Sequence, residues 1–228
     1  MDWNREQREY YDHRAGEYDE WWLRQGRYEL PPDLSSRWRD DVAQAESALD
    51  TFAPTGQVLE LAPGTGLWTR HLVRYAEHVT AVDASAAMIA RNRDRLAGQP
   101  VSYLEADLFS WQPTGSEFDV VFFGYWLSHV PRDRFADFWS LVDRALRPGG
   151  RVFFVDSGTL PGAEVDPAGT EHRTLNDGRS FRVVKSYWQP PALRRAVRDF
   201  GWDLRAEFST NGMILFGQAT RREPGPGA

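Results

Sequence analysis

A glycine-rich turn that follows a short apolar run is the feature that most constrains the fold of this chain. Val58–Ala62 predicts a buried strand, and the next residues place Gly64 and Gly66 in front of a helical stretch. Glycine lets the backbone approach a ligand closely, and the first turn of a helix leaves N–H groups free to bind it. In an open α/β sheet, ligands bind at such a turn, beyond the carboxyl ends of the strands. The segment therefore predicts a ligand site on an α/β fold.

Short apolar runs and helical stretches continue to alternate after this turn. Strands are predicted at residues 79–83, 101–106, 118–123 and 151–156, and helices at residues 66–76, 86–97 and 132–147. This alternation predicts a parallel sheet with helices on both faces. Nearer the C-terminus, Ser180–Tyr187 and Met213–Ala219 flank a helix near residues 191–200 and predict an antiparallel strand pair at one edge of the sheet.

The first fifty residues have a helical pattern. Tyr11, Ala15, Tyr18 and Trp22 share one apolar face, and Gly16 predicts a break in that helix. Pro31–Pro32 ends the segment. A second helix is expected to start from a cap at Ser35 or Ser36. Its apolar stripe consists of Trp38, Val42, Ala45, Leu49 and Phe52.

Composition narrows the classes of function. The formal net charge is -6, and no basic stripe that could hold nucleic-acid phosphates is visible, so nucleic acid is not the expected partner. The chain has no cysteine, which excludes disulfides, thiolate catalysis and cysteine-based metal sites. No apolar run is long enough for a membrane span, and the first residues are charged. We expect a soluble, cytoplasmic protein.

Two acidic residues stand at the ends of successive predicted strands. Asp83 follows the glycines by about twenty residues, a position suited to a hydrogen bond with ribose hydroxyls. Asp107 ends the third strand and is suited to the exocyclic amine of an adenine. The alternative is that each acid only caps a helix, since Asp83 stands just before a helical stretch. Together with the glycines, the two acids predict nucleoside binding.

The sequence here resembles the class I methyltransferases that use S-adenosylmethionine (SAM). Motifs of the family match Glu60–Gly66, Asp83, Asp107–Leu108, Phe118–Phe123 and Leu146–Gly150. One departure is Ala62, which stands where the family usually has its first glycine. We expect the alanine methyl to fit, with a negative φ.

The resemblance implies a Rossmann-like core with a seven-stranded, mostly parallel sheet, an antiparallel edge strand and N-terminal lid helices. We expect a single domain over residues 1–222, with the lid in residues 1–52 and the core in residues 55–222, before a disordered tail at residues 223–228. It also implies SAM as cofactor, S-adenosylhomocysteine (SAH) as product, and no metal. The residues expected at the cofactor are Tyr11, Tyr18, Glu60, Ala62, Gly64, Gly66, Asp83, Ala84, Met88, Asp107, Leu108 and Phe123.

Two other kinds of site are disfavoured. The sequence motif that binds nicotinamide dinucleotides requires a third glycine or alanine at the position where this chain has Thr69. His13, His71 and His78 show no spacing that would gather them with paired carboxylates into a metal site.

His129 is the expected catalytic base, because it follows the fourth strand beside the expected methyl position. Its alternative role is to cap or pack the loop before Pro131. The residues expected to contact the acceptor substrate are Trp22, Tyr28, Tyr125, Trp126, His172, Arg179 and Tyr187. The segment Asp156–Ser180 has the composition of a loop that could cover a pocket. Arg173, Arg179 and Lys185 are either ligands for an acidic substrate or solvated surface charges.

The expected reaction is therefore methyl transfer from SAM to an oxygen or nitrogen of a small-molecule metabolite, aromatic or amphipathic, in secondary metabolism. Two alternatives stay open: carboxyl methylation, and a SAM-binding protein that does not methylate. The sequence leaves open whether the protein is a monomer or a homodimer.

Overall fold

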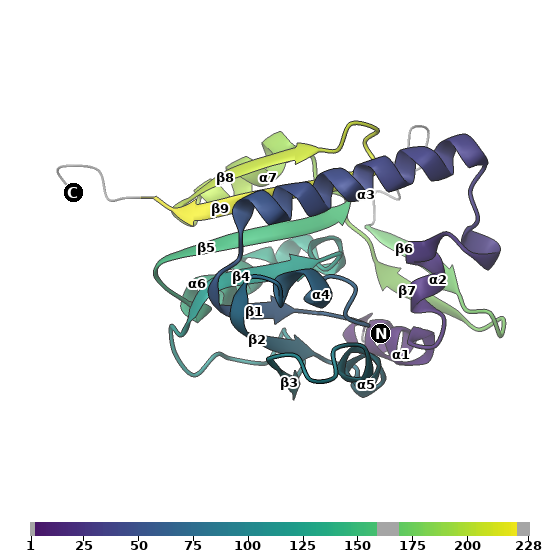
Figure 1. Ribbon diagram of the computed structural model, residues 1–228, viewed down its shortest axis with the longest axis horizontal. Coiled ribbons are helices and arrows are strands. Elements are labelled where there is room, and N and C mark those ends of the chain that lie inside the picture. The colour runs from purple at the N-terminus through teal and green to yellow at the C-terminus, as the bar shows by residue number, and fades with distance from the viewer. Residues whose placement is uncertain (1–2, 159–168, 223–228) are drawn as a thin grey trace.

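The central sheet has seven strands and carries the site at one end. The computed structural model describes residues 3–158 and 169–222, so the tail expected at 223–228 lies outside the described residues. The strands run in the order β3-β2-β1-β4-β5-β9-β8 (Figure 1). Their bounds are β1 (Gly56–Leu61), β2 (Ala76–Asp83), β3 (Val101–Glu105), β4 (Phe118–Gly124), β5 (Leu146–Ser157), β8 (Trp202–Phe208) and β9 (Ile214–Arg221). The order reverses between β1 and β4, the place where such sheets bind ligands.

The seven-stranded, mostly parallel sheet is confirmed, with one difference at its edge. β9 runs antiparallel to both β5 and β8, so the antiparallel strand lies one position in from the edge, which is formed by β8. β8 was not expected as a strand. It follows the α7 helix (Pro190–Arg198) directly, and its alternating buried and exposed residues give it one face on the core.

The expected pairing of Ser180–Tyr187 with Met213–Ala219 is wrong. Residues 180–184 form β7 (Ser180–Val184), which pairs with β6 (Thr170–Thr174) in a separate two-stranded sheet. β6 also corrects the view that Asp156–Ser180 is only a loop; residues 159–168 of that segment lie outside the described residues. A short turn around Gly178 lets these two strands pair with each other.

Helices cover both faces of the large sheet. They are α3 (Pro32–Phe52), α4 (Thr69–Leu72), α5 (Ala86–Arg95), α6 (Phe135–Ala145) and α7. Two apolar clusters result, one on each face, and β1, β4 and β5 contribute to both because their side chains alternate in direction. The predicted stripe of α3 is buried or half-buried along its whole length, and the helix crosses β5 and β9 in Figure 1.

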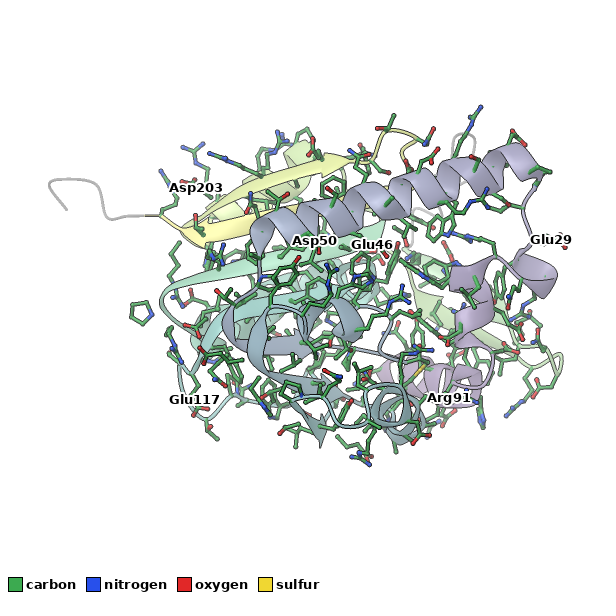
Figure 2. All side chains as sticks on the ribbon, viewed as in Figure 1. Glu29, Glu46, Asp50, Arg91, Glu117 and Asp203 are labelled. Atoms are coloured by element: carbon green, nitrogen blue, oxygen red, sulfur yellow. The ribbon has the colours of Figure 1, made fainter. Side chains whose placement is uncertain are left out.

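The α3 helix begins at Pro32, three residues before the expected cap. Proline suits the first turn of a helix because it has no N–H to leave unpaired there. Glu46 and Asp50 project from α3 (labelled in Figure 2). Glu46 lies 3.2 Å from His71 Nε2 in α4, and Asp50 forms an ion pair with Arg74, just after α4. These contacts, half-buried at Glu46 and His71 and more exposed at Arg74, tie α3 to the helix that follows the glycine turn.

Two short helices precede α3 and cover the ligand end of the sheet. α1 (Trp3–Arg14) and α2 (Tyr18–Leu23) are separated around Gly16, as the sequence predicts. The single turn η1 (Gly26–Tyr28) then leads to α3. α1 packs beside β7 and α5 at the end of the sheet where the N-terminus is marked in Figure 1. Within the described residues, no helix is both long and apolar enough to cross a membrane.

Candidate functional site

The glycine turn after β1 is held against the end of β2. The Gly64 N–H donates to Asp83 Oδ2 at 3.0 Å. Gly64 and Gly66 both adopt positive φ, +56° and +88°. At Gly66 a Cβ atom would lie 2.7 Å from Oδ1 of Asn92, so a side chain there would displace the α5 residue that supports the turn.

Ala62 has a left-handed backbone, contrary to expectation. It was expected to have a negative φ, but its φ is +54°, in the left-handed region that an L side chain adopts only at a cost. Its N–H donates to the Val82 carbonyl at 2.9 Å, which continues the β1–β2 ladder by one residue and fixes this conformation. Tyr125, one residue beyond β4, has φ +56° and donates to Val155 in the same way. Backbone strain thus lies at the ends of the two central strands, beside the site.

Asp83 is available to a ligand because another residue caps α5. The cap is Ser85, whose side chain accepts from the Met88 N–H at 3.1 Å and donates to Asp12 of α1. Asp83 accepts from the Ser85 N–H at 2.9 Å as well as from Gly64. Burial raises the pKa of the Asp83 carboxyl to about 6, although these N–H groups oppose the shift. The capping alternative for Asp83 is therefore wrong.

Asp107 lies beyond β3 and is reached by the N-terminal helix. Its Oδ1 accepts from the Phe109 N–H at 2.9 Å, and its Oδ2 accepts from the Asn4 side-chain amide at 2.6 Å. Met88, only 1% exposed, lies in the same cavity as Asp107 and Leu108. At this end of the cavity, the Asp107 carboxylate can accept from the amine of an adenine. Met88 and the turn at Leu108 can pack on the two faces of the ring.

These groups line one cavity of about 650 Å³, which we call the cofactor cavity. Its lining consists of Asn4, Gln7, Arg8, Tyr11, Tyr18, Ala62, Gly64, Asp83, Ala84, Ser85, Met88, Asp107, Leu108, Gly124, Tyr125, Trp126 and His129. Its carboxylates, small turn residues and apolar wall fit SAM, which offers ribose hydroxyls, an adenine and a charged methionine end.

A second cavity of about 820 Å³ adjoins the first, and we call it the acceptor cavity. Tyr11, Tyr18, Tyr125 and His129 line both cavities and form the wall between them. The other residues of the acceptor cavity are Arg14, Trp21, Arg24, Leu30, Trp38, Ser157, Gly158, Arg173, Lys185, Tyr187 and Met213. Two adjoining cavities that share one wall can bring two small molecules into contact.

His129 is buried in this shared wall, in the turn η2 (Leu127–His129). Its Nδ1 lies 2.6 Å from the Val184 carbonyl oxygen, which only accepts, so Nδ1 carries the proton. Nε2 is then free to accept from the Tyr11 hydroxyl, 2.8 Å away. Burial holds the pKa of His129 well below its usual value, and the charges of Lys185 and Arg173 act in the same direction. The imidazole is neutral at neutral pH.

Several predicted residues lie outside both cavities. Glu60 is buried beneath the turn, where burial raises the pKa of its carboxyl to about 8. Gly66 shapes the turn without lining the cavity, and Phe123 packs in the core against Phe138 while the next residue, Gly124, lines the cavity. Trp126, expected at the substrate, lines the cofactor cavity instead.

Four residues expected to contact the substrate do not line the acceptor cavity: Trp22, Tyr28, His172 and Arg179. His172 is exposed and its neighbour Arg173 points inward, as alternation along β6 requires. Trp22 belongs to the core, and Trp21 lines the cavity. Tyr28 lies behind Arg14, with its hydroxyl 3.4 Å from the Arg14 guanidinium.

Arg179 is exposed and pairs with Asp177 at 2.6 Å, outside both cavities. Three further lining residues were not predicted: Asn4, Gln7 and Arg14. They reach the site only because α1 packs on β7. In the described part of the chain, no three His, Asp or Glu side chains gather closely enough to hold a metal ion.

Comparisons with known proteins agree with this geometry. A family model for a methyltransferase domain matches residues 58–150. An uncharacterised methyltransferase of Mycobacterium tuberculosis is 32% identical over 124 residues, which are 54% of this chain and 61% of that protein. A ubiquinone biosynthesis O-methyltransferase of Xylella fastidiosa is 31% identical over 157 residues, 65% of this chain and 61% of that enzyme. The chain thus spans about three fifths of these curated relatives.

Two solved structures match nearly the whole chain. The complex of DhpI with SAM and HEP is 38% identical, has a TM-score of 0.79, and the match covers 96% of this chain and 97% of that one. The DhpI–SAH complex is 36% identical with a TM-score of 0.77, covering 97% and 98%. With this extent of similarity, and with the glycine turn, Asp83 and Asp107 placed around one cavity, the chain belongs to the class I SAM-dependent methyltransferases.

Proposed function

We propose that this protein transfers a methyl group from SAM to an oxygen or nitrogen atom of a small organic molecule bound in the acceptor cavity. The observation that carries the proposal is the wall of four residues shared by the two cavities, since it lets an acceptor atom approach a methyl donor directly. That a relative 38% identical was solved with both SAM and HEP supports two adjoining ligands. The name of the Xylella relative supports oxygen as the acceptor atom.

The cofactor cavity holds the donor through its predicted residues. Asp83 would accept from the ribose hydroxyls, Asp107 from the adenine amine, and Met88 would pack on the ring. When bound, SAM supplies a methyl group on a positively charged sulfur, so no covalent enzyme intermediate is needed. The protein's tasks are to align the acceptor and to exclude water.

Tyr11 and His129 would manage the proton of a hydroxyl or ammonium acceptor. As the acceptor atom gains a methyl group, its proton would pass to the Tyr11 oxygen while the Tyr11 proton passes to Nε2 of His129. The neutral imidazole, with Nδ1 fixed on Val184, is in the tautomer that this transfer requires. The aromatic residues Trp21, Trp38 and Tyr125 suit an acceptor with an apolar part.

The test is to incubate the protein with labelled SAM and a pool of small hydroxylated, amino and acidic compounds, and to measure SAH release. We expect SAH in proportion to labelled product, and labelled small molecules rather than labelled protein. His129→Ala should abolish turnover and keep SAM affinity. SAM binding without any SAH release across the pool would instead support a non-methylating protein, and label on a carboxyl oxygen would support carboxyl methylation.

A further inference from the structure

The acceptor cavity is lined by an excess of positive charge. Arg14, Arg24, Arg173 and Lys185 line it, whereas no aspartate or glutamate within the described ranges does. Two carboxylates behind the lining form ion pairs with these cations. Glu171 lies 2.7 Å from Arg173, and Asp156 lies 3.9 Å from Lys185. Four cations against two carboxylates leave two positive charges without an ion-pair partner.

Arg14 is the first of these unmatched charges. Its side chain is 1% exposed, and no carboxylate of the described chain lies within ion-pair distance. Its guanidinium lies among the rings of Tyr10, Tyr18 and Tyr28, and its Nε–H has no hydrogen-bond partner in the structure. A buried charge without a counter-ion is expensive, so such a group is retained where a ligand completes it.

Arg24 is the second positive charge without an ion-pair partner among the described residues. Its guanidinium lies 3.6 Å from the centre of the Trp38 ring, and its Nε–H also lacks a partner. Burial lowers the pKa of Arg24 to about 10. Arg24 has a left-handed backbone at the C-terminal end of α2, with φ +56°, and lines the cavity.

Lys185 adds donors that converge on the same space. Its Nζ lies 2.8 Å from Ser128 Oγ and 2.8 Å from Ser157 Oγ, and Ser157 lines the cavity. Bound SAM would not reduce this excess of positive charge. SAM carries a sulfonium, an ammonium and a carboxylate, which sum to one further positive charge. An acceptor that complements this cavity must therefore bring negative charge.

We propose that the acceptor cavity binds a doubly negative acidic group, a phosphonate or a phosphate monoester, through Arg14, Arg24, Arg173 and Lys185. The inference rests on the proposed function and names its class of substrate. Two unmatched positive charges select a dianion over a carboxylate or sulfonate. Guanidinium groups bind the oxygens of such groups in a planar, two-pronged way, and Lys185 acts as a point charge.

Binding of this acid also assists His129. Lys185, Arg173 and Arg14 are among the groups that hold the pKa of His129 low, after burial. A dianion placed among them cancels that field and raises the basicity of Nε2. The acidic group therefore anchors the acceptor and prepares the Tyr11–His129 pair to take its proton.

The test is calorimetric titration of the whole protein, saturated with SAH at pH 7.5, using methylphosphonate and methyl phosphate as probes. Methanesulfonate, a tetrahedral monoanion of the same size, and acetate are the comparison ligands. We expect at least one dianion to bind at least 10-fold more tightly than either monoanion. Equal or weaker binding of both dianions would overturn the proposal. SAH binding, measured first, tests the proposed function separately, because its failure would remove the cofactor site.

Two substitutions locate the binding. Arg14→Met leaves no carboxylate unpaired, and Lys185→Met leaves Asp156 with the N–H groups of Ser128 and Ser157. Each should weaken dianion binding at least 10-fold. The matched control is Arg179→Gln, which removes the same charge from an exposed turn and should leave the affinity unchanged. An Arg14→Met protein that loses SAH affinity but keeps dianion affinity would assign Arg14 to the cofactor and overturn its role here.

Discussion

The Tyr11 hydroxyl and His129 Nε2 lie 2.8 Å apart, across the boundary between an N-terminal helix and the loop that follows β4. His129 cannot turn away, because its other nitrogen is held by Val184 at 2.6 Å. Burial raises the pKa of Tyr11 and lowers that of His129, so both groups are neutral near pH 7. With both groups neutral, the hydroxyl is the donor and Nε2 the acceptor, so the imidazole is the group that can take a proton.

The first prediction concerns this pair. Tyr11→Phe should lower kcat by about 10²-fold or more with a hydroxyl or ammonium acceptor, the range for loss of general-base catalysis. The ring remains, so SAH affinity should stay within about 3-fold of the original. Steady-state kinetics and calorimetry check the two parts. Tyr75→Phe, outside both cavities, is the control. Unchanged kcat in Tyr11→Phe would show that the acceptor loses its proton elsewhere.

The cofactor end of the site could be predicted from the sequence because its residues follow local signals. A strand, a glycine turn and a helix place Gly64, and the end of the next strand places Asp83, whatever the rest of the chain does. Each of these positions is set by the alternation of strands and helices along the chain. Apolar runs along the chain also predicted six of the seven sheet strands, all but β8, with bounds that differ from the structure by only a few residues at most ends.

The acceptor end could be predicted only in part, because it depends on contacts between distant segments. Tyr125, Tyr187, Arg173 and Lys185 were among the candidates and line the acceptor cavity. Arg14 was not predicted, and Lys185 was left as either a ligand for an acidic substrate or a surface charge. In the structure α1 lies on β7, with the Gln7 side chain accepting from the Val184 N–H at 3.1 Å. That packing buries both cations. The register of β6 determines whether His172 or Arg173 faces the cavity, because a shift of one residue exchanges the two faces of a strand.

The second prediction concerns the left-handed Ala62. Ala62→Gly should raise the free energy of unfolding by about 0.5–1 kcal/mol, since relief of left-handed strain exceeds the extra chain entropy of glycine. Its methyl lines the cofactor cavity, and SAH affinity should be kept. Urea denaturation measures the change. Gly64→Ala, which introduces the same strain at φ +56°, should shift the midpoint downward. A lower stability of Ala62→Gly would mean that the alanine methyl has a packing role.

The third prediction concerns pH and Asp83. The folded pKa is about 6, above the usual 3.8, so the folded protein takes up a proton on Asp83 before the unfolded chain does. The contribution of this group to stability therefore decreases as the pH rises from about 4 to 6. SAH affinity should change in the opposite direction, because the ribose hydroxyls need the carboxylate, and should fall as the pH drops below 6. Calorimetry from pH 5 to 8 measures this. Asp83→Asn should bind weakly at every pH, and a flat profile for the unaltered protein would contradict the assignment.

The fourth prediction concerns Lys185 and the acidic acceptor. Burial lowers the pKa of Lys185 to about 8, with Asp156 opposing the shift and Arg173 adding to it. In the free protein, the folded chain thus loses this proton before the unfolded chain, whose lysine titrates near 10.5. The lysine's contribution to stability is least favourable below pH 8 and improves between about 8 and 10.5.

Binding of a dianion to the SAH-loaded protein should show the opposite trend, because it needs the ammonium form. We expect affinity for methyl phosphate to fall as the pH rises through about 8, which calorimetry between pH 7 and 9.5 would detect. The other groups that face this space are Arg14, Arg24, Arg173, His129 and Tyr187, with Glu171 and Asp156 behind them. Lys185 has a pKa of about 8, within the range measured, whereas that of Arg24 is about 10, above it. Lys185→Arg keeps its charge in this range, so its affinity should not decline. A decline of equal size in Lys185→Arg would show that another group controls the pH dependence.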